Sequence, residues 1–346
     1  MKTYLVAGGA GFIGSHFAEK LVKRGDRAVI LDLLTYAGHR ENLASLTPLG
    51  SWSLVEGDIC DQELVARLLR EHSVDAIVNF AAESHVDRSI TGPAAFIKTN
   101  IQGVFSLLSA SLAYWQSLTE ERKSHFRYLQ ISTDEVYGSL GTTGYFSEVT
   151  PMAPNSPYSA SKAAGDHLVR AWHHTYGLPT LTTNCSNNYG PRQFPEKLIP
   201  HMIQCALENR PLPVYGDGGN IRDWIHVEDH CDGILAALDR GQPGGTYCFG
   251  GNAERNNLDV VKQICVTLDK LRSRADGKKH ESALTFVKDR LGHDRRYAID
   301  DQLACRELDF KRKHDFESGL AHTVKWYLEN PEWRKSVLSG QKDGKK

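Results

Sequence analysis

Short apolar runs alternate with longer amphipathic stretches through the first two-thirds of this 346-residue chain, and this alternation constrains its fold more than any other feature. The runs are rich in Val, Ile and Leu, which is typical of buried strands, and the stretches between them have helical length and periodicity. Parallel strands require such crossovers, so we predict an α/β fold with a Rossmann-type, doubly wound parallel sheet. Strands are expected near residues 3–7, 28–32, 53–57, 75–81, 127–132 and 180–185, and helices near 12–24, 61–72, 93–116 and 157–176.

After about residue 187 the spacing becomes irregular and Pro and Gly become frequent, which indicates more loop than sheet. A helix-like segment over 227–239 and a strand-like run over 246–249 indicate a return to the sheet. We therefore expect a large domain over residues 1–186 with a return segment near 225–250, and a smaller C-terminal lobe over 187–224 and 251–335. The polar residues 339–346 are expected to form a disordered tail.

The charges of the chain are balanced, with 41 Lys and Arg against 42 Asp and Glu. This balance provides no net field for binding nucleic acid or an anionic membrane. The seven cysteines form no C-x-x-C pair, which argues against a disulfide framework and a metal site and favours a reducing, cytoplasmic location. We also expect no signal peptide and no membrane span, because no run approaches the roughly 20 apolar residues that a span needs.

A glycine-rich turn, Gly8-Gly9-Ala10-Gly11-Phe12-Ile13-Gly14, joins the first predicted strand to the first predicted helix. Small residues there let a backbone approach a pyrophosphate at a helix N-terminus, although any tight turn also needs glycine.

Asp32 ends the second predicted strand about eighteen residues after the glycine turn, where a carboxylate can bind a ribose diol. The turn and this carboxylate together predict a dinucleotide site. No Arg adjoins Asp32 to receive a 2′-phosphate, which favours NAD over NADP, and the alternative for Asp32 is a solvated residue at a strand end. Asp58 could contact the adenine edge or be an ordinary turn residue.

Tyr158 and Lys162 lie four residues apart and therefore on one face of a predicted helix. Ser156 and Pro157 supply its N-cap and first residue. The helix dipole and the Lys162 ammonium are expected to draw the pKa of Tyr158 down from about 10, making it a proton acceptor. The alternative is an exposed pair without a role.

Thr133, Asp134 and Glu135 follow the fifth predicted strand, at the edge of the sheet where ligands bind in open α/β folds. On a regular strand Asp134 would point away from its two neighbours, so a joint role requires the chain to leave strand geometry near residue 134. Gly138 permits such a bend. The alternative is a solvated acidic turn.

The chain resembles the nucleotide-sugar branch of the extended short-chain dehydrogenase/reductase family. The resemblance covers nearly the whole chain to about residue 330, and Thr133-Asp134-Glu135 with the run from Leu34 to Gly38 is specifically similar to the members that dehydrate dTDP-glucose. The motifs that carry it are the runs 8–14, 79–89, 133–135, 158–162, 184–191 and 214–218.

This resemblance implies that Tyr158 removes the C4 hydroxyl proton, that Lys162 holds the nicotinamide ribose and that Thr133 hydrogen-bonds the sugar. It also implies that Asp134 protonates the departing C6 hydroxyl and that Glu135 takes the C5 proton. The implied product is dTDP-4-keto-6-deoxy-glucose, formed by C4 oxidation, elimination of water and return of the hydride to C6, so that NAD is recycled.

The resemblance further implies that the large domain binds NAD, that the smaller lobe binds the nucleotide sugar, and that a homodimer forms through the helices near 93–116 and 157–176. The implied cofactor-binding residues are Gly8, Gly11, Phe12, Ile13, Gly14, Asp32, Asp58, Ile59, Ala81, Ala82, Ser84, Thr99, Tyr158, Lys162 and Asn188. The implied substrate-binding residues are Ser84, Thr133, Asn187, Lys197, Leu198, Pro213, Tyr215, Arg222, Asn257, Asp289, Arg290 and His293.

Other functions remain open on the sequence alone. A 4-epimerase, a decarboxylase or a 4,6-dehydratase for another nucleotide would share Tyr158, Lys162 and the glycine turn, but epimerisation at C4 needs no acid to expel water, so Asp134 and Glu135 favour dehydration. A catalytically silent NAD-binding regulator is a rival of another class.

Overall fold

A seven-stranded sheet, parallel throughout, forms the centre of the computed structural model, which describes residues 1–289 and 291–339. Its strand order is β10-β6-β5-β4-β1-β2-β3, so the order reverses between β1 and β4. The predicted doubly wound fold is confirmed. The strands are β1 (Thr3–Ala7), β2 (Arg27–Asp32), β3 (Trp52–Glu56), β4 (Ala76–Asn79), β5 (Arg127–Thr133), β6 (Thr180–Cys185) and β10 (Thr246–Phe249).

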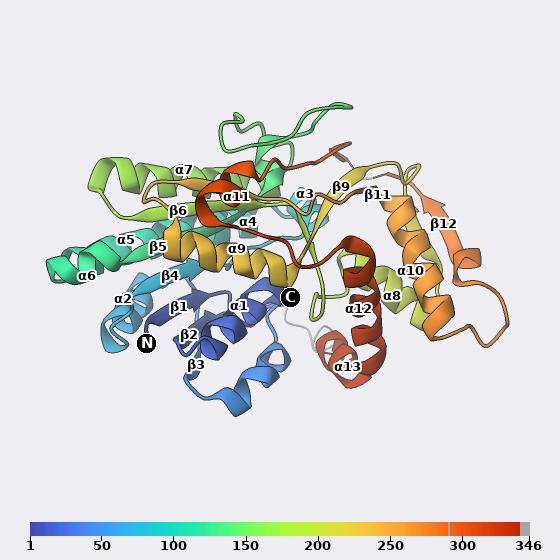
Figure 1. Ribbon diagram of the computed structural model, residues 1–346, viewed down its shortest axis with the longest axis horizontal. Coiled ribbons are helices and arrows are strands. Elements are labelled where there is room, and N and C mark those ends of the chain that lie inside the picture. Colours follow the sequence, from blue (N-terminus) through green and yellow to red (C-terminus); the bar gives the residue numbers. More distant parts are fainter. Residues whose placement is uncertain (290, 340–346) are drawn as a thin grey trace.

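Helices cover both faces of this sheet, and a separate apolar core fills each face. One face carries α1 (Phe12–Lys23), α9 (Val227–Arg240) and α11 (Gln302–Leu308), and α1 and α9 lie side by side there (Figure 1). The other carries α2 (Gln62–Glu71), α5 (Val104–Gln116) and α7 (Pro157–Tyr176). The carboxyl ends of the strands thus remain accessible, and ligands of open α/β sheets bind there, at the point where the strand order reverses.

The helix expected over 93–116 is interrupted. It consists of α4 (Ala94–Ile97), a π-helical segment (Lys98–Gly103) and α5. The Asn100 side chain leaves this segment to accept a hydrogen bond from the Glu83 backbone and to donate to Ser161 on α7. A π-helical segment often marks a functional site, and here it carries Thr99 to the end of β4.

Within the first 130 residues, the structure also contains helices that were not expected: α3 (Val86–Thr91), α6 (Glu120–His125) and a 3₁₀ helix over Arg40–Leu49. Among the described helices, none has the length and hydropathy of a membrane span.

In the part of the chain that the structure describes, the second lobe contains four α-helices, a 3₁₀ helix, a three-stranded sheet and a two-stranded sheet, around an apolar core of its own. Its elements are β7 (Asn187–Tyr189), α8 (Leu198–Leu207), β8 (Leu212–Tyr215), β9 (Ile221–His226), β11 (Glu254–Asn256), α10 (Asn257–Leu271), a 3₁₀ helix (His280–Ala283), β12 (Leu284–Val287), α12 (Phe316–Glu329) and α13 (Pro331–Ser339).

The expected assignment of all of 251–335 to this lobe is wrong at α11. Ala304, Leu308 and Phe310 pack in the core of the large domain against α9 and β10, because α11 presents its apolar side to that face of the sheet. Arg290 and residues 340–346, which include nearly all of the expected tail, lie outside the described residues.

Candidate active site

A cavity of about 320 Å³ opens at the carboxyl ends of β1, β2, β4, β5 and β6. It extends from the glycine turn to Asn187 and Lys197 at the second lobe. All five predicted catalytic residues, Thr133, Asp134, Glu135, Tyr158 and Lys162, line it. The tertiary structure therefore brings side chains from β5, from the turn after it and from α7 to one place.

The glycine turn has a shape that only glycine allows. Gly8 has a φ of +74°, and a Cβ on it would lie 2.5 Å from the backbone nitrogen of Ala81. A Cβ on Gly14 would lie 2.3 Å from the carbonyl oxygen of Gly8. The N-cap of α1 is Gly11, which has no side chain to cap the first backbone N–H groups. These N–H groups suit a pyrophosphate, so the turn fits a dinucleotide.

Asp32 lies at the end of β2 in the wall of this cavity and is 9% exposed. Its two carboxylate oxygens accept hydrogen bonds from the backbone N–H groups of Ala10 at 2.9 Å and Leu34 at 2.8 Å. Burial nevertheless raises its pKa. Each oxygen has a second lone pair, so the carboxylate can still accept from a ribose diol.

The other predicted cofactor residues also line the cavity: Gly8, Gly11, Phe12, Ile13, Gly14, Asp58, Ile59, Ala81, Ala82, Ser84, Thr99 and Asn188. Asp58 additionally shapes its own turn, since it accepts hydrogen bonds from the Cys60 backbone at 2.9 Å and from Lys98 at 3.0 Å. Asp58 thus makes the contacts of a turn residue and also lines the cavity, and its contact with the adenine edge stays a prediction.

Tyr158 occupies the first turn of α7, whose start is defined by Pro157 and a reciprocal capping pair, Ser156 and Ser159. Tyr158 is 8% exposed, and its ring packs edge-on against Phe96. The predicted lowering of its pKa is wrong for the protein alone. Burial, together with the charge of Glu135, raises the pKa of Tyr158 well above its usual value, and the Thr133 hydroxyl opposes this only in part.

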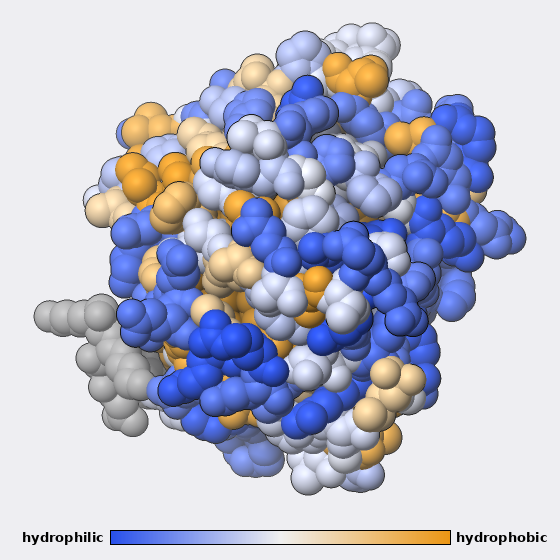
Figure 2. Space-filling model, turned by 90° about the vertical axis from the view of Figure 1, so that its left-hand side faces the viewer, coloured by the Kyte–Doolittle hydropathy of each residue, from blue (hydrophilic) through white to orange (hydrophobic). Residues whose placement is uncertain are grey.

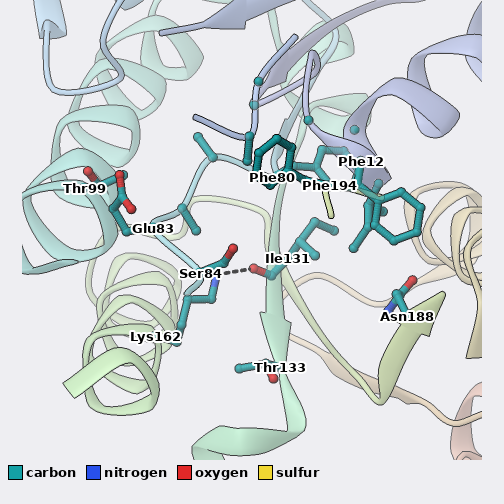
Figure 3. A pocket seen from close by; sticks show the side chains of 18 of the residues that line it. Phe12, Phe80, Glu83, Ser84, Thr99, Ile131, Thr133, Lys162, Asn188 and Phe194 are labelled. Carbon is teal, nitrogen blue, oxygen red and sulfur yellow. Dashed lines mark hydrogen bonds between the residues drawn. The ribbon is translucent and has the colours of Figure 1, made fainter. Parts of the chain in front are cut away.

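Lys162 reaches from α7 to β5, where its Nζ donates a hydrogen bond of 2.6 Å to the carbonyl oxygen of Ile131 (Figure 3). Burial lowers the pKa of Lys162. In the same view Thr133 lies below Lys162 at the end of the strand, whereas Phe12, Phe80 and Phe194 line the opposite part of the cavity (Figure 3).

The chain leaves strand geometry at residue 134, as predicted. β5 ends at Thr133, a 3₁₀ turn covers Asp134–Tyr137, and Gly138 follows with a φ of +89°. The Thr133 hydroxyl accepts a hydrogen bond from the backbone of Glu135 at 3.2 Å, which stabilises this turn. Asp134 and Glu135 can therefore both line the cavity.

The two carboxyl groups of this turn have different surroundings. Asp134 is 2% exposed, and burial together with the charge of Glu135 raises its pKa well above the usual range. Glu135 is only half-buried. Because the environments differ, the pair can hold one protonated acid beside one ionised base.

Only some of the predicted substrate residues line the cavity: Ser84, Thr133, Asn187 and Lys197. The Lys197 ammonium donates to the carbonyl oxygen of Ser84 at 2.7 Å. Five others lie elsewhere in the second lobe: Leu198 begins α8, Pro213 and Tyr215 belong to β8, Asn257 begins α10, and Asp289 follows β12.

Tyr215, Asp289 and His293 lie together at the end of β8. A hydrogen bond of 2.6 Å joins Asp289 to His293, whose ring centroid lies 6.4 Å from that of Tyr215. Arg222 on β9 stacks on Tyr297 at 4.1 Å and is close enough to Asp134 to favour its charged form. Arg222 therefore lies between Tyr297 and Asp134, one of the residues that line the cavity.

Fifteen of the described residues that line the cavity were not predicted as site residues, and they include Glu83, Gln193, Phe194 and Glu196. Phe194 stacks on His39 with ring centroids 5.4 Å apart, and burial raises the pKa of Glu196. Glu83 lies in the run 79–89 that carries the family resemblance. The other three of these four had no sequence signal beyond their proximity to Lys197, because no local pattern shows which side of a loop faces a cavity.

Among the described residues, three side chains outside this cavity lie close enough together to be considered as metal ligands. One ligand atom each from His226, Glu228 and His314 lies within 4.8 Å of the others. The two imidazole rings are stacked, with centroids 4.0 Å apart and planes at 26°, so their in-plane lone pairs do not converge on one point. This arrangement does not match a preformed metal site.

The parallel sheet, the glycine turn, the carboxylate that ends β2 and the Tyr158–Lys162 pair define the class as an NAD-dependent short-chain dehydrogenase/reductase. The family described as GDP-mannose 4,6 dehydratase matches residues 5–323, and the chain belongs to this family.

Several relatives are similar over almost their full length. A dTDP-glucose 4,6-dehydratase of Xanthomonas campestris pv. campestris (strain B100) is 59% identical over 340 residues, covering 98% of this chain and 97% of that protein. The dTDP-glucose 4,6-dehydratase 1 of Escherichia coli (strain K12) is 50% identical, covering 97% and 95%.

Solved structures agree with this relationship. A dTDP-glucose 4,6-dehydratase from Bacillus anthracis in complex with NAD has a TM-score of 0.86 and 44% identity, covering 97% of this chain and 100% of that one. A UDP-glucose 4-epimerase from Thermus thermophilus with NAD has a TM-score of 0.83 and 27% identity, covering 95% and 99%. The fold is thus shared by dehydratases and epimerases, so the residues of the cavity must separate the two activities.

Proposed function

We propose that this chain is an NAD-dependent dehydratase that converts dTDP-glucose into dTDP-4-keto-6-deoxy-glucose. The observation that carries the proposal is the placement of Asp134 and Glu135 in the same cavity as Tyr158 and Lys162. The names of the relatives at 50–59% identity support the same activity.

The residues around the glycine turn and Asp32 fit NAD, with backbone N–H groups for its pyrophosphate and a carboxylate for a ribose. The negative charge of Asp32 disfavours a 2′-phosphate at that ribose. When bound, NAD supplies a hydride acceptor that is positively charged in its oxidised form and returns the hydride at the end of the cycle.

Tyr158 is the base that receives the C4 hydroxyl proton, and Thr133 orients that hydroxyl. The buried phenol holds its proton firmly in the protein alone. The Lys162 ammonium lies in the same cavity, on the same face of α7 as Tyr158, and its positive charge favours the phenolate. Lys162 thus supports proton transfer as well as binding a ribose hydroxyl.

Asp134 and Glu135 perform the elimination of water. A ketone at C4 acidifies the C5 proton, which Glu135 removes, while Asp134 gives its proton to the departing C6 hydroxyl. Burial and the charge of Glu135 raise the pKa of Asp134 and so favour its protonated form, which is the state an acid needs before the step. A 4-epimerase has no water to expel, and a silent regulator needs none of these groups.

The second lobe is proposed to hold the nucleotide diphosphate. Lys197 lies in the cavity wall, and Arg222 lies near Asp134, so both can contribute positive charge to a pyrophosphate. Residues 1–186 with the return segment and α11 would form the NAD-binding domain. The preference for thymine rests on the similarity to dTDP-glucose dehydratases.

We also propose a homodimer in a cytoplasmic setting. Large apolar side chains are exposed near the proposed interface, with Ile97 56% exposed, Phe105 46% and Tyr176 48%. Figure 2 shows the side of the molecule toward which α5 and α7 extend, where groups of apolar side chains lie among hydrophilic ones. A second copy of α5 and α7 could cover the exposed apolar residues.

The function is tested by incubating the NAD-loaded protein with dTDP-, UDP-, GDP- and CDP-glucose and analysing the products by mass spectrometry. Loss of one water from dTDP-glucose is expected, and the Glu135→Gln protein serves as the matched control. A product of unchanged mass that is epimerised at C4 would contradict the proposal. Faster loss of water from another nucleotide-glucose would contradict the assigned base.

A further inference from the structure

Asp166 is a buried acid on the catalytic face of α7, one turn after Lys162. Tyr158, Lys162 and Asp166 follow one another at four-residue intervals and therefore lie along one face of the helix. They are 8%, 5% and 3% exposed. The first two line the cavity, whereas Asp166 is absent from its lining.

One oxygen of Asp166 is held firmly and the other is not. The Ser132 hydroxyl on β5 donates a hydrogen bond of 2.5 Å to Oδ2. Oδ1 is buried and has no hydrogen-bond partner among the described residues. A buried carboxylate with an unsatisfied oxygen is costly unless an opposite charge lies near it.

That opposite charge belongs to Lys162. Burial raises the pKa of Asp166 to about 6, and the charge of Lys162 is the largest of the influences that lower it. The Ser132 hydroxyl of β5 and the Asn184 amide of β6 are neutral groups that also lower it. The other titratable groups that face it are the phenols of Tyr128 on β5 and Tyr137 in the turn after it, and burial raises the pKa of both.

The groups around Lys162 also indicate that Lys162 and Asp166 form a pair of opposite charges. Burial lowers its pKa, and the largest opposing influence is the charge of Asp166. The remaining group that faces it is the Cys185 thiol on β6, which stays neutral because burial raises its pKa to about 12. Asp166 is therefore the anion that favours a charged Lys162.

We propose that Asp166 is a positioning residue, whose carboxylate keeps Lys162 in its cationic form while its bond to Ser132 fixes the strand segment to which Lys162 binds. Ser132 directly follows Ile131, whose carbonyl oxygen accepts the Lys162 hydrogen bond. This inference rests on the function proposed above, in which Tyr158 needs a neighbouring positive charge.

A purely structural tie between α7 and β5 is the alternative. An amide at position 166 could also accept the Ser132 hydrogen bond, although more weakly than a carboxylate, and it would avoid the cost of burying a charge. Three variants separate the two roles. Asp166→Asn removes the charge and keeps the shape, Ser132→Ala removes the hydrogen bond and keeps the charge, and Asp166→Glu restores the charge.

The first measurement is the pKa of Lys162 in the full-length, NAD-loaded protein, followed by NMR of lysine labelled with ¹³C at Cε. A unit charge a few ångströms away in a partly buried site shifts a pKa by about one unit or more. We expect a fall of that size in Asp166→Asn, recovery in Asp166→Glu and little change in Ser132→Ala. An unchanged Lys162 pKa in Asp166→Asn would overturn the proposal.

The second measurement is the pH profile of kcat with dTDP-glucose. Because Lys162 loses its charge at a lower pH in Asp166→Asn, the alkaline limb should move to lower pH by the same amount. A shifted Lys162 pKa with an unmoved limb would also overturn the proposal. If Asp166→Asn does not fold, Asp166→Ser is measured instead. Failure of the unmodified protein to make product would contradict the proposed function and would leave the NMR result to stand by itself.

Discussion

The Lys162 ammonium on α7 and the Ile131 carbonyl oxygen on β5 are joined by a buried hydrogen bond of 2.6 Å. This bond ties the helix that carries Tyr158 to the strand that ends in Thr133, so the base and the hydroxyl beside it keep a constant separation. Because this hydrogen bond restrains the Lys162 side chain, its ammonium group stays buried and its positive charge has a fixed position in the cavity. The hydrogen bond therefore links the fold of the sheet to the proposed proton transfer.

The two halves of the proposed mechanism should be separable by mutation. Tyr158→Phe removes the base for C4 oxidation, so NADH should form slowly or not at all. Asp134→Asn and Glu135→Gln leave that base in place and impair elimination, each by about 10²–10⁴-fold for a general acid or base. These two variants should still reduce bound NAD when given substrate. Stopped-flow absorbance at the NADH band, followed by product analysis, measures both steps.

The result that contradicts these roles is equally specific. Glu135→Gln should not form product at the normal rate, and Tyr158→Phe should not accumulate NADH as fast as the unmodified protein. Normal product formation by Glu135→Gln would require another base for the C5 proton, and normal NADH formation by Tyr158→Phe would require another base for the C4 hydroxyl.

Asp32 should determine the choice of cofactor. Asp32→Ala removes a carboxylate that can bind a ribose and repel a 2′-phosphate, so NAD affinity should fall roughly 10-fold or more while NADP affinity falls less. Titration of each cofactor by calorimetry measures the change. Asp26→Ala is the matched control, because Asp26 is also buried and accepts a backbone hydrogen bond from Lys2, outside the cavity lining. Tighter binding of NADP by the unmodified protein would refute this role.

His314 and Asp229 should make stability depend on pH. The hydrogen bond of 3.0 Å that His314 Nδ1 donates to the Asp229 carboxylate raises the pKa of His314, and it lowers the pKa of Asp229 against the opposing effect of burial. The contribution of a group with a raised pKa is fully present below its unfolded value, about 6.5, and is lost as pH rises through the folded value. The contribution of Asp229, whose pKa is lowered, is fully present above its unfolded value of about 4 and is lost as pH falls through the folded value.

His314→Ala should therefore lower the free energy of unfolding by about 1 kcal/mol near pH 6 and by less near pH 9. Urea unfolding at both values measures this, with His322→Ala as the control on the same side of the lobe. An equal loss at both pH values would show that the charge of His314 contributes nothing.

Association should depend on the exposed apolar side chains of α5 and α7. Phe105→Glu places a charge where Phe105, 46% exposed, contacts Trp172 of α7, so a dimer should dissociate more readily. Val266→Glu on α10, 48% exposed, is the control and should leave association unchanged. Light scattering at micromolar concentration gives the mass of each protein. A monomeric unmodified protein would exclude the proposed dimer.

Local pattern alone was sufficient for much of this protein. The alternation of apolar runs with amphipathic stretches located every strand of the central sheet, because burial on both faces imposes continuous apolar sequence on a parallel strand. The glycines of the first turn, the cap of α7 and the bend after Thr133 were also readable, since backbone sterics and caps act between neighbours in the chain.

Tertiary structure decided the rest. It interrupted the helix around Asn100, placed α11 against the large domain and brought Phe194 and Glu196 into the cavity wall. It also reversed the expected shift of the Tyr158 pKa, because the helix dipole and Lys162 act locally, whereas the loss of water around the phenol and the approach of Glu135 depend on segments far away in the sequence. Desolvation and long-range charge are properties of the packed molecule, and no local pattern of residues encodes them.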